Sequence, residues 1–138
     1  FERPTEVTGP ISLEAYVASS ADDTDLVGRL IDVGPEGNAI LLTEGILRLR
    51  YRDSFEKPEL VKPGQVYRVT VDLWATANVF KTGHRLRLEV TSSSFPRYDR
   101  NPNHGGDLSG ETKPIPATNA IYHDHEHPSA LIVPIVPR

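Results

Sequence analysis

The sequence predicts an all-β protein, a β-sandwich of about eight strands of the jelly-roll kind. No segment sustains the 3.6-residue apolar period of a helix, whereas apolar and polar residues alternate along much of the chain. Turns rich in Gly, Pro, Asn and Asp separate these segments at irregular spacing, and cysteine is absent. The irregular loops and the lack of a Cys…Trp…Cys framework favour a jelly roll over an immunoglobulin-like sandwich, two folds that pattern alone separates poorly.

Three strands are predicted in the first half of the chain. Residues 11–17 alternate strictly, and residues 26–33 have a mixed pattern that is typical of a strand covered on both faces. The stretch 34–38, Gly-Pro-Glu-Gly-Asn, predicts a turn. In residues 47–52 Leu and Tyr alternate with Arg, which predicts a strand with one buried and one cationic face.

The second half contributes a hairpin, a long loop and two short strands. Apolar residues alternate in 67–73 and again in 86–90, with Thr-Gly turning the chain between the two segments. Residues 93–116 form a polar loop of a length that usually indicates a functional or mobile segment. Residues 120–122 and 131–133 are the late strands, and the prolines after the last one place it at a sheet edge.

Composition indicates one soluble globular domain over residues 1–138. The 138 residues carry a net charge of −4, so nucleic acid and anionic membranes are poor partners, and no apolar run approaches a membrane span. Cysteine is absent, which excludes disulfides and thiol chemistry. No signal peptide is evident; the compartment stays open, with the cytoplasm favoured over secretion. Because the chain has no Met and starts at Phe1, we expect a part of the protein to be missing upstream.

Nothing in the sequence predicts catalysis or a cofactor. A serine nucleophile of the α/β-hydrolase kind needs a G-x-S-x-G turn between a strand and a helix. The stretch 106–110, Gly-Asp-Leu-Ser-Gly, has its serine at the wrong position, and no helix is predicted. There is no glycine-rich phosphate loop either. We therefore assign no catalytic residue and expect the chain alone to be inactive.

Two clusters have residue types that bind metals. In an extended segment His123, His125 and His127 would point to one side and could chelate zinc, copper or nickel, but the nearby Pro and the charge density favour a loop. Aspartates at 22, 23 and 25 could bind calcium, but no Gly or Glu completes an EF-hand spacing. A turn with side-chain hydrogen bonds is the expected structure there.

Arginines and a tryptophan are the other candidate binding residues. Arg48, Arg50 and Arg52 could form an anion site, or could be solvated or paired with acids on a neighbouring strand, which we favour. Trp74 has the outward parity of its strand. Burial against another domain is favoured for it over stacking on a sugar.

Segments along nearly the whole chain resemble one family of enzymes. The most specific is 73–103, which includes Ser-Phe-Pro-Arg-Tyr-Asp-Arg-Asn at 94–101, and shorter matches lie at 3–10, 21–26, 41–48, 51–54 and 122–129. Together they resemble the C-terminal domain of serine hydrolases of the X-prolyl dipeptidyl-peptidase, cocaine esterase and α-amino-acid ester hydrolase family. Their shared order and spacing make the resemblance specific.

The resemblance implies a galactose-binding-like jelly roll that follows an α/β-hydrolase domain carrying the catalytic triad. The implied role is a non-catalytic domain that packs on the hydrolase domain, shapes access to its active site and supports a possible homo-oligomer. The alternative is a free-standing carbohydrate-binding module, which rests on fold analogy.

The loop after residue 93 is the predicted contact with the hydrolase domain, because mixed aromatic and charged residues suit a recognition surface. The alternative is a self-packed loop that closes one end of the sandwich. The predicted interface residues are Trp74, Phe95, Arg97, Tyr98, Asp99, Arg100 and Asn101.

Overall fold

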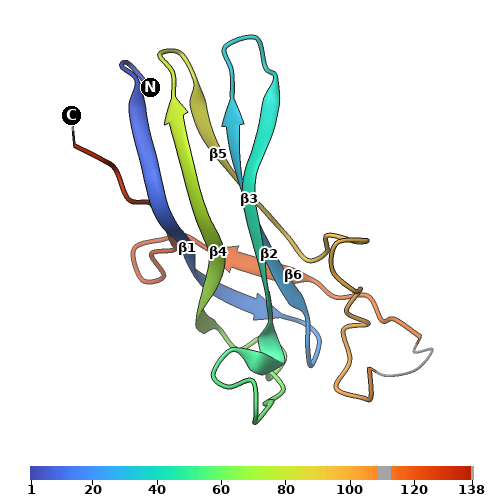
Figure 1. Ribbon diagram of the computed structural model, residues 1–138. Helices are drawn as coiled ribbons and strands as arrows, with labels where there is room; N and C mark the ends of the chain where they lie inside the picture. The colour runs from blue at the N-terminus through green and yellow to red at the C-terminus, as the bar shows by residue number, and fades with distance from the viewer. Residues whose placement is uncertain (109–112, 138) are drawn as a thin grey trace.

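The computed structural model describes residues 1–108 and 113–137 and shows two antiparallel sheets packed face to face (Figure 1). These residues contain seven strands, where about eight were expected for the chain. No helix in the described residues is long and apolar enough to cross a membrane. The elements are β1 Thr5–Ser19, β2 Asp25–Val33, β3 Ala39–Arg48, the 3-10 helix η1 Leu49–Tyr51, β4 Tyr67–Phe80, β5 Arg85–Thr91, β6 Asn119–Tyr122 and β7 Ala130–Ile132.

The chain passes repeatedly between the two sheets. One sheet has the order β4-β1-β6, with β7 also paired to β1, and the other has the order β3-β2-β5. Only the β2–β3 and β6–β7 connections stay within one sheet. All other connections cross the sandwich, which is the behaviour of a jelly roll and confirms the predicted fold class.

Alternating apolar residues build the core between the sheets. The inward row predicted for β4, with Val69, Val71 and Leu73, is buried and lies beside the inward row of β1, so that both rows face the other sheet. In β2 every residue except Arg29 is buried, so this strand is covered on both faces as its mixed pattern indicated. The core joins both sheets into one cluster.

The predicted strand over residues 47–52 is wrong. β3 ends at Arg48, and the chain then turns through η1. The alternation of Leu and Arg continues past the strand because both kinds of side chain have partners in the domain. Leu49 enters the core, while Arg50 reaches a buried carboxylate.

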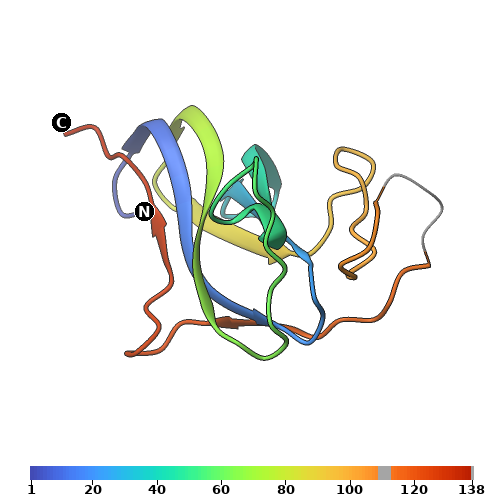
Figure 2. The same ribbon diagram turned by 90° about the horizontal axis from the view of Figure 1, so that it is seen from below.

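The two long sides of the sandwich differ. On one side β3 lies against β4: Thr43 donates its hydroxyl hydrogen to the carbonyl of Leu73, and a Cβ on Gly45 would lie 1.8 Å from the carbonyl oxygen of Asp72. On the other side β5 is the edge of its sheet, with β2 as its only strand neighbour among the described residues. Figure 2 shows the loop after β5 and the C-terminal segment projecting from opposite ends of the molecule.

Candidate functional site

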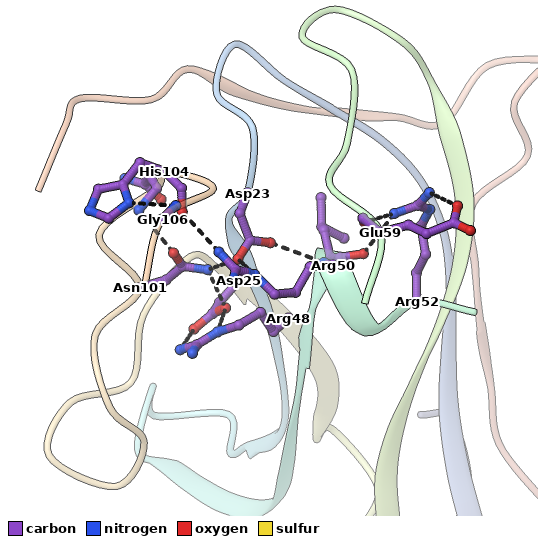
Figure 3. A network of polar contacts seen from close by, with 11 residues as sticks. Asp23, Asp25, Arg48, Arg50, Arg52, Glu59, Asn101, His104 and Gly106 are labelled. Atoms are coloured by element: carbon purple, nitrogen blue, oxygen red, sulfur yellow. Dashed lines mark hydrogen bonds and ion pairs between the residues drawn. The ribbon is translucent and has the colours of Figure 1, made fainter. Parts of the chain in front are cut away.

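Two buried carboxylates anchor one end of the sandwich (Figure 3). Asp25 accepts two hydrogen bonds from Arg48, at 2.8 and 3.1 Å, and Asp23 accepts one from Nε of Arg50 at 2.7 Å. Asp23 and Asp25 are almost fully buried, so their charges need these partners. The hydrogen bonds that Arg48 donates to Asp25 raise the pKa of Arg48 above its usual value. Arg48 and Arg50 are therefore paired with acids, as the favoured interpretation had it.

The same network holds the long loop after β5. The amide of Asn101 donates to both carboxylates, at 3.1 Å to Asp23 and 2.8 Å to Asp25. Arg50 also donates to the carbonyl of His104 at 2.8 Å. The loop is thus attached to the sandwich by bonds that are shielded from water. Because the oxygens of these two aspartates are occupied by donors, the cluster does not have the free ligands that calcium needs.

A second polar cluster lies on the outer side of β3. The carboxylate of Glu44, only 7% exposed, pairs with Arg29 at 3.1 Å and with Arg97 at 2.8 Å. Ser94 accepts a hydrogen bond from Arg29 at 2.7 Å and donates one to Glu44 at 3.1 Å. Arg97 is therefore oriented by a buried acid while 60% of its own side chain stays exposed.

Arg97 separates two shallow hollows on this surface. One, of about 400 Å³, is lined by Trp74, Glu44 and residues 41–43; the other, of about 470 Å³, lies between η1 and the loop after β5. Together they form what we call the β3 surface, whose most prominent side chains are Leu41, Phe55, Trp74, Arg97 and Tyr98.

A local distortion presents Trp74 on the β3 surface. The β1–β4 ladder shifts register between Pro10 and Ser12, and Trp74 has a φ of 66° there. Its backbone N–H donates to the side chain of Asp72 at 2.7 Å. A left-handed conformation is costly for a bulky residue, and its indole is 69% exposed. The strand thus holds an aromatic ring outward at an energetic cost.

The structure brings only some of the predicted interface residues together. Trp74, Arg97, Tyr98 and Asp99 line the β3 surface. Phe95 and Arg100 pair with each other on the exposed part of the loop, with the guanidinium 4.1 Å from the ring centroid. Asn101 instead belongs to the buried network. The sequence interpretation missed Leu41, Phe55 and Glu44, although the unbroken apolar run 40–42 was a possible signal for Leu41.

The histidine segment is a turn, so its side chains do not align as in a strand. Asp124 accepts hydrogen bonds from the backbone N–H groups of Glu126 and His127, and the bond from His127 lowers the pKa of Asp124. The ring of His127 packs on Tyr16 and Tyr122, while His123 and His125 are exposed. Within 1–108 and 113–137 no group of three metal-ligating side chains is close enough to bind an ion.

The serine of the 106–110 stretch, Ser109, and its neighbour Gly110 lie outside the described residues. The described residues thus form a surface with aromatic rings, an oriented arginine and two hollows.

Comparison with known proteins identifies relatives that share the sequence and the fold of this chain. Cocaine esterase from Rhodococcus sp. (strain MB1 Bresler) is 47% identical over 137 residues, which are 98% of this chain and 24% of that protein. An α-amino acid ester hydrolase superposes with a TM-score of 0.92 at 30% identity, over 99% of this chain and 24% of that chain. An aminopeptidase from a marine sediment archaeon, Thaumarchaeota archaeon, gives 0.93 at 28% identity, with the same coverage.

The chain thus spans about a quarter of the length of these relatives. Residues 1–132 match the family described as the X-Pro dipeptidyl-peptidase C-terminal non-catalytic domain. The resemblance seen in the sequence is confirmed, and the chain belongs to this family of non-catalytic C-terminal domains.

Proposed function

We propose that the domain packs on the α/β-hydrolase domain of a larger serine hydrolase through the β3 surface, and there shapes access to the active site. The parent enzyme would act on acyl, ester or X-prolyl peptide substrates. The observation that carries the proposal is the group of exposed apolar side chains around Arg97 on that surface.

The exposure of these side chains favours a partner. Leu41 is 50% exposed, Trp74 69% and Phe55 84%. Single exposed apolar residues are common, but a group of large ones beside shallow hollows is typical of an interaction surface. Trp, Tyr and Arg are also the residues most enriched at the centres of protein interfaces.

The surface is also arranged in advance of binding. Glu44 fixes Arg97, and the network of Asp23 and Asp25 fixes the loop that carries it. A side chain already held in its bound geometry loses less conformational entropy when a partner docks. The strained backbone of Trp74 supports the same conclusion, because such strain persists where function requires it.

Hydroxyl-radical footprinting tests the proposal without any substitution. Trp74 and Phe55 are expected to be modified several-fold more slowly in the full-length hydrolase than in the chain 1–138. Ile135 is 60% exposed in the C-terminal segment, away from the loop after β5, and provides the control (Figure 2). Equal modification of Trp74 in both proteins would remove the β3 surface as the contact.

The proposed effect on active-site access needs a kinetic test. In the full-length enzyme Trp74→Ala is expected to change kcat/KM for bulky esters more than for small ones, because a loosened domain alters the approach to the site. Ile135→Ala is the matched control and should change neither value. Unchanged selectivity in Trp74→Ala would confine the domain to a structural role.

The exposed indole also favours the second candidate, a carbohydrate-binding module. Sugar rings stack on exposed aromatic faces, and Trp74 lies beside an open hollow. This function requires saturable binding on a glycan array by the chain 1–138 that is lost in a folded Trp74→Ala variant.

A further inference from the structure

The edge strand β5 leaves its core-facing side chains incompletely covered. Its inward residues Leu86, Leu88 and Val90 pack on the core but are only partly buried. The inward Leu47 on the opposite edge strand, β3, is buried beneath β4. The difference arises because no described strand lies beyond β5.

A gap accompanies this edge. A cavity of about 320 Å³ opens between the end of β5 and β6, and its lining includes Val90, Leu26, Leu49 and Ile121. These residues come from both sheets, so the hollow opens from the surface onto the interior of the sandwich. Core-facing side chains are normally well covered, so a further segment would fit over this hollow.

The first residue of the chain lies beside the start of this edge. Phe1 donates its N–H hydrogen to the carbonyl of His84 at 2.7 Å, and Gly83 donates to the carbonyl of Phe1 at 2.9 Å. Gly83 and His84 together therefore lie opposite Phe1, and Gly83 has a left-handed φ of 82°. Two residues opposite one, with a left-handed glycine as the first of the two, form a G1-type β-bulge. The ring of Phe1 stacks on buried Phe80 at 4.8 Å. Phe1 is thus already paired antiparallel to the chain that leads into β5.

We propose that the residues immediately before Phe1 in the full-length protein form an additional strand, antiparallel to β5, that closes the open side of the sandwich. The inference rests on the proposed function only in that the chain is part of a larger hydrolase. Antiparallel pairing proceeds in opposite directions along the two strands, so the preceding residues meet β5 from Arg85 towards Thr91.

The backbone of β5 suits this addition. In a strand, alternate residues direct their N–H and C=O groups to the same side. Since the carbonyl of His84 faces Phe1, the backbone groups of Leu86, Leu88 and Val90 face the same free edge. Within the described residues no backbone hydrogen bond from a turn or loop reaches β5, and the strand has no proline to block pairing. A long unprotected edge invites a further strand.

The bulge fixes the register of the proposed strand. The first residue before Phe1 would lie opposite Arg85, and the third opposite Arg87. That third pair is of the non-hydrogen-bonded kind, with both side chains outward, because Arg87 alternates with the inward leucines. Its Cα atoms would be about 4.5 Å apart, within the range that a disulfide spans.

A cysteine pair tests the strand in the full-length hydrolase. Cysteine is placed at the third residue before Phe1 together with Arg87→Cys, in a background without other cysteines. An intramolecular disulfide is expected in most molecules after mild oxidation, identified by peptide mass spectrometry. The control joins the same upstream cysteine to Arg68→Cys, an exposed site on β4, and should give no bond.

The proposal is overturned if no intramolecular bond forms at Arg87, or at Arg85 or Glu89 to allow for a shifted register. Disulfides found only between molecules would also overturn it, because a second copy would then cover the edge. Amide exchange offers a measurement that needs no variant: at least tenfold slower exchange at Leu88 and Val90 is expected in the full-length protein than in the chain 1–138. Footprinting of Trp74 in the same samples reports on the β3 surface separately, so either idea can fail alone.

Discussion

The two sheets are joined directly along one long side of the sandwich and stay apart along the other. On the β3–β4 side the sheets meet through backbone, with Gly45 against Asp72 and Thr43 bonded to Leu73. On the β5–β6 side a hollow of about 320 Å³ remains, and the inward leucines of β5 are only partly buried. The closed side is complete within this chain and carries the β3 surface outside. The open side has no described strand beyond β5, and we propose that residues upstream of Phe1 complete it.

Closing one side has consequences for where a partner can act. A rigid, closed edge holds Trp74 and Arg97 in fixed positions, which suits recognition. An open edge suits the addition of a strand by backbone hydrogen bonds, which depend little on side-chain identity. On our proposals, one side of the fold serves side-chain recognition and the other is completed by an added strand.

The largest expected effect comes from breaking the closed side. In Gly45→Ala the new Cβ would lie 1.8 Å from the carbonyl oxygen of Asp72, so β3 and β4 must separate. We expect a loss of about 4 kcal/mol in the free energy of unfolding, measured by chemical denaturation of the chain. Gly106→Ala, which meets only the side chain of His104, should cost less than about 1 kcal/mol. A mild effect at Gly45 would mean that the sides do not differ in this way.

Asp23→Asn should rank next, because it breaks a buried ion pair at the junction of the loop with the sandwich. The substitution leaves the charge of Arg50 without its partner, at a cost of about 3 kcal/mol. The exposed neighbour in Asp22→Asn gives the matched control and should be near neutral. Faster exchange of the amides in 94–104 is expected only in the Asp23 variant. Unchanged exchange there would show that the network does not hold the loop.

A pair of leucine truncations measures the two sides directly. Leu73→Ala removes a fully buried side chain from the closed side and should cost about 3 kcal/mol. Leu88→Ala removes a half-exposed one from the open side and should cost about 1 kcal/mol in the chain 1–138. In the full-length protein the cost of Leu88→Ala should increase if a strand covers β5. Equal costs for both leucines in the short chain would contradict the asymmetry.

Trp74→Gly should change the free energy of unfolding little, and any change should be an increase, unlike the losses expected above. Glycine adopts a φ of 66° without strain, and the lost indole is mostly exposed. The chain 1–138 is therefore expected to be unchanged or more stable by up to ~1 kcal/mol. In the full-length protein the same substitution should raise the rate of protease cleavage between the domains. Marked destabilisation of the short chain would show that Trp74 serves the fold itself.

How far the sequence predicts the structure depends on the range of the interactions. Alternation located β1, β4 and β5, which bury one face in the core, and a mixed apolar pattern located β2, which is covered on both faces. Alternation failed as a guide after Arg48. The leucines there pack in the core and the arginines bond to two distant aspartates, although the chain is no longer a strand. Asp23 and Asp25 precede these arginines by more than twenty residues, and a local pattern does not contain that pairing.

The candidate site shows the same limit. Outward parity placed Trp74 correctly at the surface, but its left-handed backbone depends on the bulge opposite Pro10. Glycine inside a strand often marks a close backbone approach, so Gly45 carried a readable signal of the closed side. The three histidines followed a strand-like spacing, yet the hydrogen bonds of Asp124 impose a turn. Over so few residues, hydrogen bonds accepted by an aspartate side chain determine the backbone conformation more strongly than the spacing of the side chains does.

The smallest expected effect lies in that turn, which joins β6 to β7 on the open side. The pKa of Asp124 is lowered from its usual 3.8 in the folded chain, chiefly by the backbone N–H of His127. A carboxyl whose folded pKa is lowered contributes stability that is complete above the unfolded pKa and lost as pH falls through the folded one. Asp124→Asn should therefore be slightly less stable than the parent chain near neutral pH, with the difference disappearing below the lowered pKa. Urea titrations from about pH 6 to about pH 2 measure this, with Glu126→Gln in the same turn as control. A difference that stays constant over this range would show that the turn depends on the shape of the side chain and not on its charge.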